Sequence, residues 1–140
     1  MFFITKNPID ISEVIENVRD KSSGAIALFL GTIRERRNGQ VVIGMYYESY
    51  DKMAKQILKE IEGQVKLKWK VSKLLVIHRI GNLKIADISV AVAISAKHRK
   101  EAFEACRYTL EAIKRKVPIW KKEITNDGDF WVRGHLLEGD

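Results

Sequence analysis

Residues 114–123 read Lys-Arg-Lys-Val-Pro-Ile-Trp-Lys-Lys-Glu, and this stretch joins a helical pattern to an extended one. The preceding segment, 98–114, has the apolar spacing of an amphipathic helix, and basic residues suit the negative C-terminal end of such a helix. Pro118 cannot continue the helix, because its ring removes a backbone donor and clashes with the preceding turn. Lys114 and Lys121 are therefore predicted on either side of a rigid turn, an arrangement suited to holding an anion.

The rest of the chain alternates between strand-like and helical patterns. Helices are expected to begin near Asp10 or Ser12, at Asp51 and at His98. Strands are expected at residues 2–5, 24–33, 41–50, 71–80, 88–95, 119–125 and 130–133, the last two forming a hairpin. The run 24–33 is apolar enough to predict a strand buried on both faces. This order predicts the α+β class, with three helices on a mostly antiparallel or mixed sheet.

Composition limits the number of domains and the compartment. A chain of 140 residues that is 46% hydrophobic fits one core, so we expect a single domain over residues 1–140. The longest apolar stretch, 25–30, is too short to span a bilayer, and residues 1–4 lack the basic start of a secretory signal. One cysteine excludes an internal disulfide framework, so we predict a cytoplasmic protein. The net charge of +7 indicates an anionic partner without saying which kind.

Two places could carry binding chemistry on the residues alone. Arg34 directly follows the predicted strand 24–33, and strand ends often present functional groups; a solvated loop arginine is the alternative. His98 and Arg99 open the third predicted helix, where backbone N–H groups and an arginine fork can bind phosphate; an exposed polar first turn is the alternative. His78 lies inside an apolar strand and is interpreted as a structural histidine.

Metal and thiol chemistry are not expected. The three histidines, His78, His98 and His135, show no ligand spacing, so we predict no metal site. Cys106 falls on the apolar stripe of the third helix, where burial makes a thiol a poor nucleophile. If this protein transfers sulfur, another molecule has to deliver it.

Five short motifs, in the order typical of the family, resemble the large, catalytic subunit of molybdopterin synthase, and the resemblance covers roughly residues 24–132. They are Gly31-Thr32-Ile33-Arg34, Ile77-His78-Arg79-Ile80-Gly81, His98-Arg99 with Ala102-Phe103-Glu104-Ala105, the Lys114–Lys121 segment, and Asp129-Phe130-Trp131-Val132. The resemblance implies an α/β hammerhead-like fold with an additional small sheet. The chain departs from the family pattern in having Ala96-Lys97 before His98 and a short tail after Val132.

The resemblance also implies an activity and partners. The expected enzyme is a sulfurtransferase that converts cyclic pyranopterin monophosphate (precursor Z) into the dithiolene of molybdopterin. Sulfur would arrive as a thiocarboxylate on the C-terminal Gly-Gly of a small ubiquitin-like subunit. A homodimer would bind two small subunits as a heterotetramer, and no cofactor is expected. The implied catalytic residues are Lys114 and Lys121, and the implied substrate-binding residues are Thr32, Ile33, Arg34, His98, Arg99, Lys114, Lys121, Lys122 and Glu123.

Helix geometry adds a constraint on this set. His98 and Lys114 are 16 positions apart, so one continuous helix separates them by roughly 24 Å. One small pterin cannot touch both within one chain. If both residues serve one substrate, two chains must share each pocket, and a twofold homodimer is the simplest arrangement.

Two other functions fit the sequence less well. A basic nucleic-acid-binding module would account for the net charge, but the chain lacks the aromatic-basic signature of single-strand readers. A non-catalytic adaptor for a ubiquitin-like protein would need the same docking surface without turnover.

Overall fold

Two sheets and three helices make up the described part of the chain, residues 1–37 and 39–132 of a computed structural model. The elements are β1 (Phe2–Thr5), α1 (Ile11–Val18), β2 (Ala25–Thr32), β3 (Arg36–Arg37), β4 (Gln40–Ser49), α2 (Asp51–Lys68), β5 (Val71–Arg79), β6 (Gly81–Lys84), β7 (Ile88–Ala96), α3 (Arg99–Lys116), β8 (Ile119–Thr125) and β9 (Gly128–Trp131). The predicted class is confirmed, and each predicted helix and strand has a counterpart; the last strand, expected at 130–133, is β9 at Gly128–Trp131, and position 133 lies outside the described residues. The short strands β3 and β6 were not predicted. None of the described helices is both long and apolar enough to cross a membrane.

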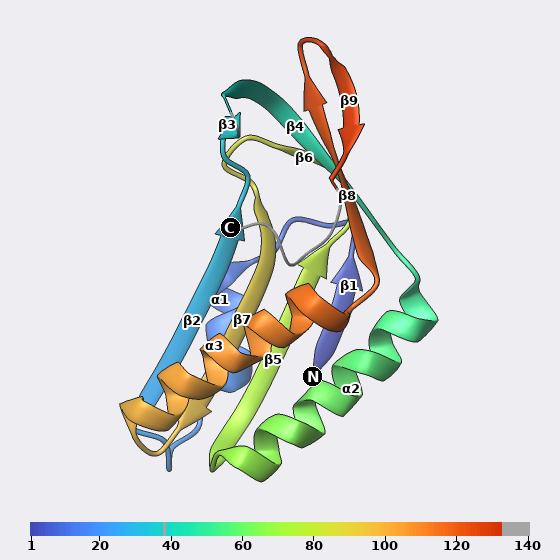
Figure 1. The fold of residues 1–140 in the computed structure, drawn as a ribbon. Helices are drawn as coiled ribbons and strands as arrows, with labels where there is room; N and C mark the ends of the chain where they lie inside the picture. Colours follow the sequence, from blue (N-terminus) through green and yellow to red (C-terminus); the bar gives the residue numbers. More distant parts are fainter. Residues whose placement is uncertain (38, 133–140) are drawn as a thin grey trace.

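The first sheet has the strand order β1-β5-β7-β2, with β1 parallel to β5 and the other pairs antiparallel. Helices α2 and α3 pack on one face of this sheet, and α1 packs against β5 and β7 on the other (Figure 1). The larger core fills the space beneath α2 and α3, and a smaller cluster around Val14 and Val18 lies under α1. The sheet is therefore the middle layer of three.

The strand that is buried on both faces is β7, and the expectation for residues 24–33 was wrong. β2 is the edge strand of the sheet, whereas α1 covers the neighbouring strands β5 and β7. Ile26 and Leu28, on one face of β2, remain 43% and 37% exposed. An apolar run thus marked a sheet strand correctly, but the position of that strand in the sheet decided its burial.

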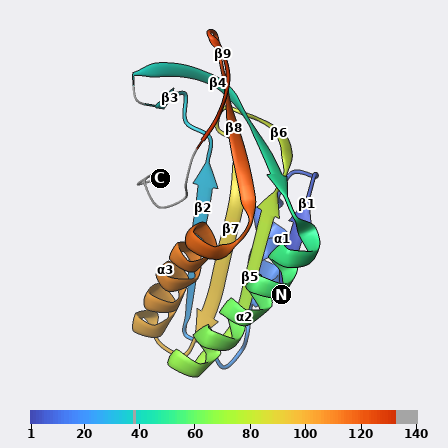
Figure 2. The same cartoon turned by 45° about the vertical axis from the view of Figure 1, so that its right-hand side comes forward.

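The second sheet is built around β4, which pairs with β3, β6 and β8, while β9 pairs with the outer side of β8. Figure 2 shows this sheet rising beyond the end of the first one, with β8 leading into it directly from α3. The start of β8 is tied to the end of β4, since the Tyr50 amide donates to the Pro118 carbonyl at 3.3 Å. The chain thus passes from α3, which packs on the first sheet, into the second sheet at the turn that the sequence predicted.

Helix ends follow the local sequence signals. Asp10, one of the two predicted caps, is the N-cap of α1, and its Oδ1 accepts from the amides of Ser12 (2.9 Å) and Glu13 (3.4 Å). α3 has His98 as its N-cap and runs unbroken to Lys116. The single straight helix that the distance argument required is therefore present.

We predict opposite stability effects for Gly63→Ala and Gly81→Ala. Both glycines have open space where a Cβ would stand, but Gly63 lies exposed inside α2, whereas Gly81 has a φ of +91°. Alanine at position 63 should stabilise the fold by about 0.5–1 kcal/mol, because glycine loses more backbone entropy than alanine when folding fixes it in a helix. Alanine at position 81 should destabilise it by about 1 kcal/mol or more. Urea unfolding of the two variants measures both effects, and equal shifts in the same direction would contradict the backbone assignment.

Candidate active site

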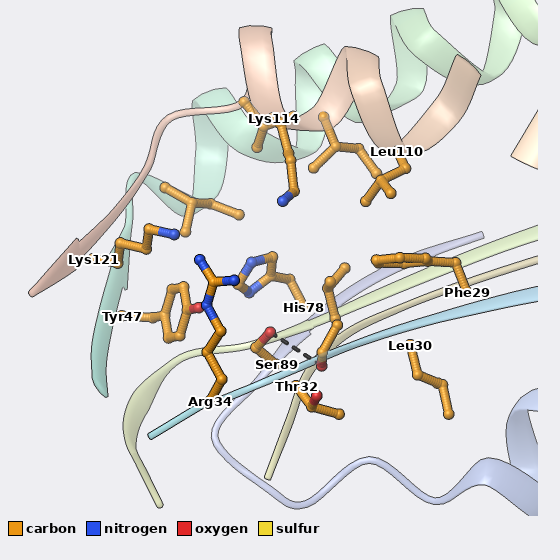
Figure 3. Close-up of a pocket in the computed structure, with 15 residues that line it drawn as sticks. Phe29, Leu30, Thr32, Arg34, Tyr47, His78, Ser89, Leu110, Lys114 and Lys121 are labelled. Atoms are coloured by element: carbon orange, nitrogen blue, oxygen red, sulfur yellow. Dashed lines mark hydrogen bonds between the residues drawn. The ribbon is translucent and has the colours of Figure 1, made fainter. Parts of the chain in front are cut away.

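A pocket of about 300 Å³ opens where the end of the first sheet meets α3 and β8 (Figure 3). Six elements and the loop after β2 contribute to its lining, which is Phe29–Thr32 of β2, Arg34 of the loop, Tyr47 of β4, His78 of β5, Ser89 and Val90 of β7, and Leu110, Ile113, Lys114, Val117, Ile119 and Lys121 from α3 through β8. This volume is at the small end of the range for small-molecule sites. The pocket is the place where the two sheets and the predicted turn meet.

Lys114 and Lys121 both reach this pocket, from opposite sides of Pro118 (Figure 3). Lys114 belongs to the last turn of α3, and Lys121 stands opposite Tyr47 in the β4–β8 ladder. Cross-strand partners share a face, so Lys121 and Tyr47 point into the pocket together. The two lysines, which were predicted on either side of a rigid turn, thus line one pocket.

Arg34 is held at the pocket by backbone contacts of its neighbour. The Ile33 amide donates to the Asp87 carbonyl at 3.1 Å, and the Ile33 carbonyl accepts from the Ala86 amide at 2.7 Å. The Ile33 side chain is buried in the core, so this residue anchors the loop and does not line the pocket. Ala86 has a φ of 73°, which is costly for a residue with a Cβ, and Arg79 clamps the same turn through Asp87 at 3.3 Å. Arg34 is therefore fixed by a turn between β6 and β7.

Two further predicted residues, Lys122 and Glu123, are adjacent to the pocket but do not line it. Alternation along β8 turns Lys122 to the other face, where its Nζ lies 5.2 Å from the Tyr46 ring and 5.3 Å from the Trp131 ring. Glu123 is buried, 7% exposed, two residues beyond Lys121 on the pocket side of the strand. Thr32, at the end of β2, does line the pocket.

His98 and Arg99 do not meet the other predicted residues within this chain. They stand at the opposite end of α3 from Lys114, and the His98 side chain is 70% exposed, with Nδ1 3.8 Å from a Glu101 carboxylate oxygen. A continuous helix keeps this end roughly 24 Å from Lys114. Within one chain the pocket is therefore built without them.

His78 is the pocket residue that the sequence interpretation missed. It is only 8% exposed, its Nδ1 lies 2.8 Å from the Arg79 carbonyl oxygen, and its ring meets the Tyr47 ring at 5.2 Å between centroids. Burial, aided by the positive charges of Lys121 and Lys114, lowers the pKa of His78 to about 4 against the effect of the Arg79 hydrogen bond. One side of the ring is held by the Arg79 carbonyl, and the other side faces the pocket. Its place near the end of an apolar strand was the available signal.

Three aligned residues on neighbouring strands of the first sheet form the floor of the pocket, and one of them has no side chain to fill it. Gly31, Val90 and His78 are aligned on neighbouring strands β2, β7 and β5. A Cβ on Gly31 would stand 2.8 Å from a Val90 methyl and 3.3 Å from the Ser89 hydroxyl oxygen. The Ser89 hydroxyl donates to the Gly31 carbonyl at 3.3 Å (Figure 3), at the point where the β2–β7 register shifts and Ser89 is the extra residue of β7. A side chain at position 31 would push into this floor.

Cys106 lies on the face of α3 that packs into the core, as predicted. Burial raises the pKa of its thiol to about 11, and Sγ is 3.7 Å from the Val92 carbonyl oxygen, to which the thiol donates. Within residues 1–37 and 39–132 no three His, Cys, Asp or Glu side chains come together as a metal site requires. His135 and the tail after Val132 lie outside the described residues.

The chemistry of the pocket follows from its lining. Arg34, Lys114 and Lys121 supply three cations, while Phe29, Leu110, Val117 and their neighbours supply apolar walls. No carboxylate occurs among the described residues that line it. Cations grouped against apolar walls interact more strongly with a bound anion than they would in open water. The pocket is therefore suited to a small anion that carries an apolar or planar part.

Most of the chain resembles proteins of one family. The family model described as MoaE protein matches residues 4–116. The molybdopterin synthase catalytic subunit of Bacillus subtilis is 44% identical over 135 residues, 96% of this chain and 86% of that protein. The subunit of the same name from Pyrococcus abyssi is 39% identical, covering 94% of this chain and 90% of that protein. The crystal structure of molybdopterin synthase from Staphylococcus aureus matches with a TM-score of 0.88 and 40% identity, over 92% of this chain and 94% of that one.

We predict that folded protein protects Cys106 from thiol reagents. With a pKa near 11 and a buried sulfur, the thiol should react with a disulfide reagent at pH 8 at least about 100-fold more slowly than it does in the urea-unfolded chain. Absorbance of the released thiolate reports both rates on the same sample. Rapid labelling of one thiol per folded chain would show that Cys106 is accessible and ionised.

Proposed function

The chain belongs to the MoaE protein family, and from this premise we propose that it acts as the catalytic subunit of a molybdopterin synthase. The family resemblance drawn from five motifs is thereby confirmed. The proposed reaction converts cyclic pyranopterin monophosphate into the molybdopterin dithiolene by sulfur transfer. The observation that carries the proposal is the convergence of Arg34, Lys114 and Lys121 on one pocket with apolar walls.

The cations fit the anionic part of this substrate. A cyclic phosphate carries negative charge, and the opened phosphate carries more, so lysine and arginine donors aimed at one space can stabilise both. Arg34 is the guanidinium of the set, which favours two-pronged contact with phosphate oxygens. Thr32 adds a hydroxyl at the same rim.

The sulfur comes from outside this chain. The one cysteine is buried with a raised pKa, so it is a poor donor. We assign the donor role to a small ubiquitin-like subunit whose C-terminal Gly-Gly tail ends in a thiocarboxylate. Two glycines lack side chains and can thread between apolar walls such as those of Leu110 and Val117. The thiocarboxylate would then reach the lysines.

The two lysines then have separable roles. Lys114, on the last turn of α3, offsets the negative charge that develops as the thiocarboxylate reacts, and orients its terminal carbonyl. Lys121, on β8, protonates the leaving oxygen or stabilises the opened phosphate. Lys122 and Glu123 extend the substrate-binding set along β8, outside the described pocket lining.

Residues from a second copy complete the pocket. His98 and Arg99 are separated from Lys114 by the full length of α3, so they serve the site of a partner chain in a twofold dimer. Two catalytic chains with two small subunits make a heterotetramer. We place this assembly in the cytoplasm, and treat residues 1–140 of the chain as one domain within it.

The structure lends little support to the two alternative functions, a nucleic-acid-binding module and a non-catalytic adaptor. The three cations at issue line a pocket of about 300 Å³, whereas a nucleic-acid backbone needs an extended charged track. A docking adaptor would bind the small subunit without turnover. The reaction itself separates these functions.

We expect that the purified chain, mixed with cyclic pyranopterin monophosphate and a thiocarboxylated small subunit, forms the dithiolene product. Lys114→Ala should lower the rate at least about 100-fold, because a preorganised cation is lost at the reacting group. Lys116→Ala, an exposed position on the same helical turn, is the matched control and should stay near the wild-type rate. Product is measured by its fluorescent oxidised derivative. Wild-type turnover by the Lys114 variant would remove this lysine from the mechanism, and no product with wild-type protein would refute the function.

A mixing experiment tests the shared pocket. Arg99→Ala and Lys114→Ala are each expected to be inactive, but randomly exchanged subunits would place both defects in one pocket of a heterodimer and neither in the other. About half the dimers would then have one intact site, restoring about a quarter of the wild-type activity. Heterodimer formation is followed with two distinguishable tags. Heterodimers without activity would show that each pocket uses residues of one chain only.

A further inference from the structure

The position of the proton on His78 follows from its hydrogen bond. Nδ1 lies 2.8 Å from the carbonyl oxygen of Arg79. A carbonyl oxygen only accepts, so Nδ1 must carry the hydrogen. In a neutral imidazole the other nitrogen, Nε2, then has a lone pair and acts only as an acceptor.

The ring is held firmly in this state. It is 8% exposed, and the Tyr47 ring meets it edge-on at an interplanar angle of 65°. Lys114 and Lys121 face it from α3 and β8, and their charges oppose protonation together with burial, which leaves the pKa of His78 near 4. Arg34 approaches from the loop after β2 (Figure 3). At neutral pH the pocket therefore combines three cations with one fixed neutral acceptor.

This combination distinguishes the two ends of a pterin phosphate. Phosphate oxygens are acceptors, and the lone pair of Nε2 would repel them. The N–H and amino groups of a pterin ring are donors, and the cations cannot pair with them. The hydroxyls of Thr32, Ser89 and Tyr47 can donate or accept, so they do not make this distinction.

We propose that Nε2 of His78 accepts a hydrogen bond from an N–H or O–H group of the bound pyranopterin, and so sets which end of the substrate faces the lysines. This inference rests on the proposed function, because it takes the pterin as the ligand. It assigns a substrate-binding role to a residue that lies outside the site set expected from the family resemblance.

Two substitutions separate this role from a structural one. In His78→Asn the side-chain amide can still donate to the Arg79 carbonyl, but nothing reaches the place of Nε2. In His78→Gln the longer amide can place its oxygen near Nε2, while the donor at the place of Nδ1 is lost. A structural role thus predicts that Asn is the better replacement, and an acceptor role predicts that Gln is.

Binding is measured by calorimetry with cyclic pyranopterin monophosphate and a small subunit that lacks the thiocarboxylate, so that no turnover occurs. We expect His78→Asn to bind about 10-fold more weakly than wild type, and His78→Gln to stay within about 3-fold. Phenyl phosphate, which lacks pterin donors, should bind wild type and both variants alike. Thermal unfolding of each variant is recorded beside the titrations.

The outcomes decide between the roles. Wild-type affinity in His78→Asn, or equal losses in both variants that follow their thermal stability, would overturn the acceptor role while leaving the sulfur-transfer function standing. Failure of wild-type protein to bind the pterin would instead refute the proposed function, and the acceptor role with it. Nitrogen-15 NMR of labelled histidine gives an independent check: a neutral ring with its hydrogen on Nδ1 at pH 6–8 is expected, and a hydrogen on Nε2 would overturn the proposal.

Discussion

The junction at Pro118 is the constraint on which the rest of this site depends. α3 is packed on the first sheet and must stop there, because proline cannot extend the helical hydrogen-bond ladder. The next residues enter the second sheet at once, and the Pro118 carbonyl is bonded to the end of β4. The pocket exists because these two layers are joined by so short a connection. Lys114 belongs to α3, which packs on the first sheet, and Lys121 belongs to β8 of the second sheet. The two lysines therefore meet only where these parts are joined.

The sequence was sufficient to predict the elements, since apolar periodicity and capping residues act locally. Asp10 caps α1, and the stripe that includes Cys106 faces the core, because both depend on a few neighbouring positions. The burial of β2 was mispredicted, because exposure at Ile26 and Leu28 depends on which strand lies at the sheet edge. β6 was missed for a similar reason: its four residues are a strand only because β4 lies beside them.

The candidate site was predicted in part, for related reasons. Lys114, Lys121 and Arg34 stand beside recognisable signals, namely a helix end, a proline and the end of an apolar strand. His78 stands near the end of an apolar strand as well, but that signal does not distinguish a pocket residue from a structural one, and its position at the pocket comes from the register that sets it in line with Val90 and Gly31. His98 and Arg99 present the converse case. Local sequence marked them well, yet no arrangement within one chain brings them to the lysines.

The opposite orientation of Lys121 and Lys122 has a consequence for how this chain can change over evolutionary time. Neighbouring strand residues face opposite sides, so deleting one residue between Lys114 and Lys121 would carry Lys122 into the pocket position and move every later side chain of β8 to the other face. An insertion would bring Trp120 there instead. Loops elsewhere can lengthen or shorten at small cost. A relative that uses the same pair of lysines must keep their seven-residue spacing, so this short interval is closed to insertions and deletions even where its individual residues can vary.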